Sequence, residues 1–218
     1  MPILGIENRT ENWKTAVHFS PLFIGNSNRL AERLGVTPLP ASEDVKLELF
    51  WTGMRDHLNG RKMNKRIAKN ELVDCYNRMF PNLRRDIEQF GKLRLPNPPN
   101  YDTSTDARMD RLVDNLVNTE IDVVLDTPNN LVIGEAKHYE RFGANGSYVL
   151  VHQLIRQYVL AKILVDFLPN KVEKGVIPFV VGDNVEYLHK TAQVQFMIKQ
   201  GWMKNDNLLC WDEIPPCY

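Results

Sequence analysis

Charged side chains recur at every second position in two neighbouring stretches of the chain, Glu120 with Asp122 and Glu135 with Lys137. Carboxylates that lie side by side repel each other, and a divalent cation relieves that repulsion. Mg²⁺ prefers hard oxygen ligands and usually takes one or two carboxylates together with water and substrate phosphate. A lysine beside such an ion can orient a water molecule or stabilise developing negative charge. These residues predict a site for Mg²⁺, or for Mn²⁺ in its place; the alternative is an exposed ribbon face with ion pairs such as Glu120–Lys137.

Two predicted strands position these residues, Glu120–Asp126 and Leu131–Lys137, joined by turn-forming residues at 127–130. If the four turn residues form the loop, counting back along the strands pairs Asp122 with Glu135. Because side chains alternate between the two faces of a strand, all four charged residues project from one face. The other face is expected to be apolar and to carry Ile121, Val123, Leu125, Val132, Gly134 and Ala136.

At these residues the chain resembles the PD-(D/E)xK nuclease superfamily, whose signature is an acidic residue in one strand and Glu-x-Lys in the next apolar strand. Asp122, Glu135 and Lys137 match its Asp, Glu and Lys positions, and the resemblance covers about residues 105–185. It implies Mg²⁺-dependent hydrolysis of phosphodiester bonds, most often in DNA, with all three residues catalytic and with Asp122 and Glu135 as metal ligands. It also implies a restriction-endonuclease-like fold, an α/β architecture with a mixed central β-sheet flanked by helices.

The alternative function is a nuclease-fold module that binds nucleic acid or a protein partner without cutting. The complete set of Asp122, Glu135 and Lys137 favours the enzyme, because a silent module has no physical reason to keep all three. A homodimer is one expected form of the enzyme, since cutting both strands of a duplex is simplest with two sites.

Three further residues are candidates for an accessory part in the site. A helix expected at Tyr148–Leu168 follows the Glu-x-Lys strand, and in the superfamily the equivalent helix packs beside the site. It carries Gln153 and Gln157 one turn apart, and Gln153 is predicted to border the cleft, the alternative being a solvated amide. Glu120 is expected at the edge of the cleft, and Glu71 is a candidate for the upstream acidic residue that the superfamily often has.

A basic run at Arg61–Lys69 is the one concentrated stretch of positive charge. Contact of Lys62, Lys65 and Arg66 with nucleic-acid phosphates is its functional interpretation. The alternative is a solvated helix face, which is the usual role of a charge run.

The chain has 218 residues, is 43% hydrophobic and carries no net charge at pH 7, so it can bury a core with an appended region. A neutral chain argues against nonspecific coating of nucleic acid, although it allows a local basic patch. The cysteines Cys75, Cys210 and Cys217 are odd in number and lack metal-ligand spacing, which is typical of reduced thiols in a cytoplasmic protein. No apolar run approaches about 20 residues and the start lacks a signal-peptide layout, so neither a membrane span nor export is expected.

The remaining patterns divide the chain into a helical N-terminal region at residues 1–95 and a nuclease-like α/β core at 105–218. The expected elements are helices at Ser27–Leu34, Ser42–Asn59, Glu71–Phe80, Asn82–Phe90 and Tyr187–Gln200, strands at Val176–Val181 and Leu208–Trp211, and a loop at Gly91–Thr105. Residues 106–117 fit either a helix or a strand.

Overall fold

A computed structural model of the chain describes residues 10–20, 22, 27–41, 44–60, 65–93, 106–138, 142, 150–167 and 174–214. Within these ranges five strands form one sheet in the order β1-β2-β3-β4-β5. Their bounds are β1 (Lys46–Trp51), β2 (Ile121–Asp126), β3 (Asn130–Ala136), β4 (Gly175–Gly182) and β5 (Leu208–Cys210). Strand β2 is antiparallel to both of its neighbours, whereas β3, β4 and β5 are parallel. The predicted α/β fold with a mixed central sheet is confirmed.

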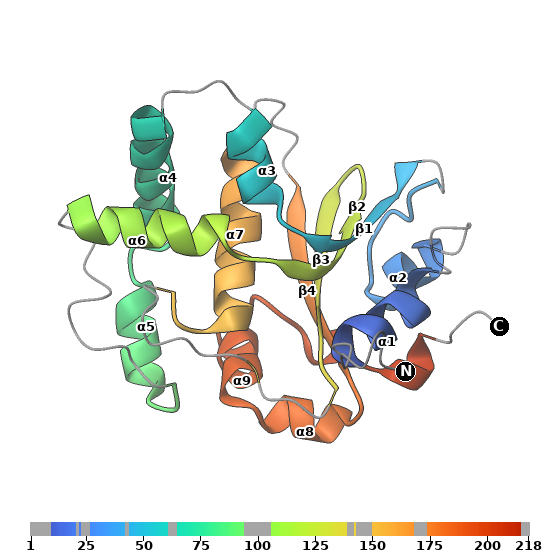
Figure 1. Cartoon of the computed structure of the whole chain (residues 1–218). Helices are drawn as coiled ribbons and strands as arrows, with labels where there is room; N and C mark the ends of the chain where they lie inside the picture. Colours follow the sequence, from blue (N-terminus) through green and yellow to red (C-terminus); the bar gives the residue numbers. More distant parts are fainter. Residues whose placement is uncertain are drawn as a thin grey trace, which may run out of the picture.

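Helices cover both faces of the sheet (Figure 1). Their bounds are α1 (Thr10–Phe19), α2 (Ser27–Arg33), α3 (Gly53–Gly60), α4 (Lys65–Met79), α5 (Leu83–Phe90), α6 (Asp106–Val117), α7 (Gln153–Phe167), α8 (Val185–Lys190) and α9 (Ala192–Lys199), with 3-10 turns η4 (Asn205–Asn207) and η5 (Trp211–Glu213). Helix α7 lies along one face against β3 and β4, beside α4, α6 and α9, while α1 lies on the other face against β2 and β3. None of the helices in the described ranges is long and apolar enough to cross a membrane.

The central strands are apolar on both faces, so two hydrophobic cores form. The core under α7 includes Val124, Ile133 and Val180, and the core under α1 and α2 includes Val123 and Phe179. Removing apolar surface from water, at about 25 cal/mol per Å², is what holds the helices on the sheet. Because β3 is covered on both faces, any charged side chain in the middle of this strand is forced out of water.

The hairpin of β2 and β3 has the predicted register. Asp126 pairs with Leu131, and Val123 pairs with Gly134. The turn closes where the amide of Thr127 donates a hydrogen bond to a carbonyl oxygen two residues beyond Pro128. Turn length alone therefore set which positions of the two strands face each other.

The predicted face of Ile121 is wrong. Ile121 packs with Val124 in the core under α7, whereas Val123 packs in the other core. Residues two positions apart share a face only while the strand is regular. Here β1 is distorted beside β2, because Phe50 has a φ of 54°, a left-handed conformation that is uncommon for residues other than glycine. In the β1–β2 register this distortion falls opposite Asp122.

The predicted helix at Ser42–Asn59 is wrong, because this segment forms the edge strand β1 and then the short helix α3. Lys46 and Glu48 are exposed while the leucines that follow each of them are half-buried, which is the period of two of a strand. The expectation of a helix rested on acidic residues near Ser42, a weaker signal than this alternation. The N-terminal region is thus not wholly helical; its division from the core at residues 95–105 stays a prediction.

The other elements agree with the sequence in type more than in extent. Residues 106–117 are a helix, which settles their ambiguity, and the helix after the Glu-x-Lys strand begins at Gln153. The single helix predicted at Tyr187–Gln200 is two helices, α8 and α9, interrupted at Thr191. Most of the loop predicted at Gly91–Thr105 lies outside the described residues.

Replacing Gly134 by alanine should destabilise the protein, because a Cβ at this position would lie 2.2 Å from Cζ of the buried Phe179 ring. Overpacking of this kind costs about 1–3 kcal/mol, measured as the free energy of unfolding in urea. The matched control is Phe179→Leu, which makes room for the new methyl group. The double variant should be less destabilised than the sum of the two single variants, and additive costs would contradict the proposed clash.

Candidate functional site

The candidate site lies where β2 separates from β3. The β2–β3 ladder ends at Val123 and Gly134, but the pairing of β3 with β4 continues through Ala136. Beyond the end of the ladder, the backbone amide of Ala136 donates a hydrogen bond to Oδ2 of Asp122 at 2.9 Å. The carboxylate of Asp122 therefore occupies the gap between the two strands and is bound to the peptide between Glu135 and Lys137.

Glu135 and Lys137 form a buried ion pair on the face of the sheet that α7 covers. Nζ of Lys137 lies 2.6 Å from Oε1 of Glu135, and only 5% of Lys137 and 1% of Glu135 are exposed. The other carboxylate oxygen, Oε2, accepts a hydrogen bond of 2.5 Å from Nε2 of Gln157 on α7, which also donates to the carbonyl oxygen of Glu120. The ring of Phe142 lies 5.8 Å from the Lys137 ammonium.

This pair is difficult to explain as a stabilising feature. Removing two charges from water costs several kcal/mol per ion, and an apolar pair of similar volume is often as stable or more stable. Glu135 and Lys137 sit among the apolar residues of α7 and β4, where such a replacement would pack well. Their presence at this position therefore makes them candidates for function.

Of the accessory candidates, the structure places Glu120 with an exposed side chain at the start of β2, Gln153 half-buried at the first turn of α7, and Glu71 exposed on α4. Lys62 lies outside the described residues, and so do the side chains of Lys65 and Arg66. The parts that these residues play in the site stay predictions.

Gln157 is the residue of this site that the sequence candidates omitted in favour of Gln153. It is 1% exposed and hydrogen-bonded to Glu135. A signal was present in the sequence, because Gln157 is followed by an almost unbroken apolar run, Tyr158–Ala161. A helix that is apolar on nearly every side is buried, so an amide within it needs a polar partner in the core.

Among the residues described, no group of three or more His, Cys, Asp and Glu side chains is arranged to hold a metal ion. A metal at this site would rest on fewer protein ligands, as Mg²⁺ often does when water and substrate phosphate complete its shell. Asp122 and Glu135 offer two hard-oxygen donors beside the Ala136 peptide, and the buried Oε1 of Glu135 accepts no hydrogen bond within the described part of the chain. The residues fit Mg²⁺, and the ammonium of Lys137 lies against the same oxygen.

Comparisons of the chain with family models, with curated proteins and with solved structures found no match. Membership of the nuclease superfamily therefore stays a prediction that Asp122, Glu135 and Lys137 carry. The function has to be inferred from the contacts of these side chains.

Replacing Gln157 by leucine should destabilise the protein, because Oε2 of Glu135 would then be buried without its donor. Leaving a buried acceptor unsatisfied costs roughly 1–3 kcal/mol, and more when the acceptor is charged. The control is Gln153→Leu, which makes the same change one helical turn earlier at a half-buried position. Urea unfolding of both variants checks this, and an equal or larger loss for Gln153→Leu would show that the contact of Gln157 with Glu135 has no special importance.

Proposed function

We propose that the protein is a metal-dependent nuclease that hydrolyses phosphodiester bonds, most readily those of DNA, and that its core is restriction-endonuclease-like. The observation that supports this proposal most is the buried Glu135–Lys137 pair with the carboxylate of Asp122 bound to the peptide between them. Two carboxylates and one ammonium are the groups that a cation and a phosphate dianion require of a protein.

In the proposed reaction, the oxygen of a water molecule bonds to phosphorus and the P–O bond to one ribose oxygen breaks. The products are a phosphomonoester and a hydroxyl group, and the leaving oxygen takes up a proton. Asp122 and Glu135 would hold Mg²⁺, or Mn²⁺ in its place, and the bound ion would supply Lewis-acid stabilisation of the phosphate. Lys137 cannot ligate a cation while protonated; its ammonium stabilises charge on the phosphate or orients the attacking water.

The direct test is incubation of the protein with supercoiled, linear and single-stranded DNA and with RNA, in Mg²⁺, Mn²⁺ or EDTA. Cleavage of DNA that requires the divalent ion and stops in EDTA is expected. If the protein binds nucleic acid or a protein partner without cutting under any of these conditions, the binding-module alternative replaces the nuclease. Measuring the mass of the active species checks whether cleavage of both strands involves a homodimer.

Asp122→Asn and Lys137→Ala should affect metal binding and cleavage differently. Asp122→Asn removes a ligand, so it should weaken Mg²⁺ binding and abolish cleavage without unfolding the protein. Lys137→Ala removes a positive charge 2.6 Å from Glu135 Oε1, so Mg²⁺ affinity should not fall, while the loss of one electrostatic contact should slow cleavage about 10²–10³-fold, roughly 3–4 kcal/mol. Calorimetric Mg²⁺ titration and single-turnover cleavage measure the two effects.

The matched control is Asp126→Asn, the same substitution at the far end of β2, where the carboxylate pairs with Lys174 at 2.5 Å. This variant should bind Mg²⁺ and cleave like the wild type. Cleavage by Asp122→Asn at the rate of Asp126→Asn would exclude Asp122 from the site.

Neutralising Lys62, Lys65 and Arg66 together should weaken nucleic-acid binding and flatten its dependence on salt. Each phosphate contact that is lost releases fewer counterions, so the slope of log K against log[salt] should fall in magnitude by about 0.7–0.9 per contact. Binding isotherms at several salt concentrations measure this slope. Unchanged affinity and slope would make the basic run a solvated face.

A further inference from the structure

Lys137 is held by its backbone from two directions. Its amide donates a hydrogen bond of 2.8 Å to the carbonyl oxygen of Val181 on β4. Its own carbonyl oxygen accepts a hydrogen bond of 3.1 Å from Nε1 of the buried Trp211, the first residue of η5. The peptide units on both sides of this Cα are therefore fixed by segments that follow Lys137 by more than forty residues in the sequence.

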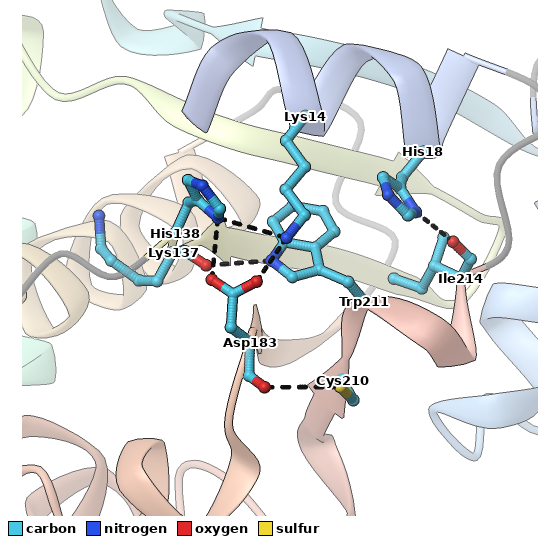
Figure 2. Close-up of polar contacts among 8 residues, drawn as sticks. All are labelled: Lys14, His18, Lys137, His138, Asp183, Cys210, Trp211 and Ile214. Atoms are coloured by element: carbon cyan, nitrogen blue, oxygen red, sulfur yellow. Dashed lines mark hydrogen bonds and ion pairs between the residues drawn. The ribbon is translucent and has the colours of Figure 1, made fainter. Parts of the chain in front are cut away.

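The next residue, His138, belongs to a polar cluster on the side of the sheet that α1 covers (Figure 2). Nδ1 of His138 lies 2.9 Å from Oδ2 of Asp183, and Nζ of Lys14 from α1 donates to the other oxygen, Oδ1. Lys14 Nζ also lies 3.3 Å from Nδ1. Since a carboxylate can only accept, Nδ1 carries the proton that it donates to Asp183, and Lys14 is its neighbour and not its donor.

Electrostatics keep this cluster together. Burial pushes the pKa of Asp183 upward, but the hydrogen bond and charge of Lys14, and then those of His138, outweigh it and hold the pKa below its usual value. The carboxylate is therefore ionised at neutral pH and can bind both partners at once.

Packing connects this cluster to Trp211. Nζ of Lys14 lies 5.0 Å from the centre of the Trp211 ring, and the rings of His18 and Phe19 lie 5.0 Å and 6.3 Å from it. Three consecutive turns of one face of α1 thus meet η5 and the end of β4 around residues 137–138. The indole can reach the Lys137 carbonyl only while α1 and η5 hold the ring in this orientation.

We propose that Trp211, Asp183, Lys14 and His138, here called the backbone clamp, are positioning residues that fix the main chain at Lys137 and so aim its ammonium at Glu135. This inference rests on the proposed nuclease function. Lys137 follows the last residue of β3, and its long side chain multiplies any tilt of its Cα. A displacement of about 1 Å at a reacting group can cost on the order of 10²-fold in rate.

The decisive variant is Trp211→Phe, which keeps an aromatic ring in the core and removes the N–H that binds the Lys137 carbonyl. Its matched control is Trp202→Phe, the same substitution at a ring stacked on Tyr158 in the other core. We expect Trp211→Phe to lower kcat by about 10-fold to 10²-fold with little change in KM, since Trp211 acts on Lys137 and not on substrate. Trp202→Phe should leave both constants unchanged at a comparable loss of stability.

Two further measurements separate positioning from general structural support. Lys14→Met should lower kcat, whereas Lys14→Arg, which keeps a cation for Asp183, should restore most of it. Amide hydrogen exchange at Lys137 should be faster in Trp211→Phe than in Trp202→Phe, and this readout requires no cleavage.

The outcomes distinguish the two proposals. A wild-type protein that cleaves no nucleic acid overturns the proposed nuclease, and the exchange rate at Lys137 then decides whether the backbone clamp exists. A wild-type protein that cleaves, with Trp211→Phe equal to Trp202→Phe in kcat and in exchange at Lys137, overturns the clamp alone.

Discussion

The ion pair between Glu135 and Lys137 lies inside the protein between β3 and α7, where a charge left without a partner would cost several kcal/mol. Its neighbours are arranged around that constraint. Gln157 donates to the carboxylate oxygen that Lys137 does not contact. A substrate phosphate or a cation entering the site would meet charges whose solvation water has already been replaced by fixed protein groups, which is the condition under which electrostatic interactions are strongest.

The pair is placed where the sheet changes character. On one side of β3 the strands are antiparallel and end early, and on the other side they are parallel and run on. One edge of β3 therefore loses its strand partner while the other edge stays fixed. Asp122 binds the backbone amide that β2 no longer satisfies, so an acidic side chain is held beside Glu135 without a residue dedicated to positioning it.

Each face of the sheet contributes a different part of the site. Helix α7 covers the Glu135 side and supplies Gln157, so it controls the carboxylate. Helix α1 and η5 cover the opposite side and contact only the backbone of Lys137 and the side chain of His138, so they control where the strand ends. This explains why α1 packs against the same strands as the conserved geometry of the hairpin requires, although nearly the whole helical region lies between it and β2 in the sequence.

The sequence by itself determined the hairpin and therefore the pairing of Asp122 with Glu135. Turn length and the two-residue repeat of a strand are local properties, and local spacing is enough to set them. Alternation at Lys46 and Glu48 carried the same information about β1, but acidic residues at an expected helix start obscured it. Only the tertiary structure decided the rest: that Ile121 leaves its expected face opposite the distorted Phe50, that Gln157 and not Gln153 binds Glu135, and that Lys14 and Trp211 meet at residues 137–138. These contacts join segments up to 169 residues apart, and no local periodicity records which distant segments the packing of two cores will bring together.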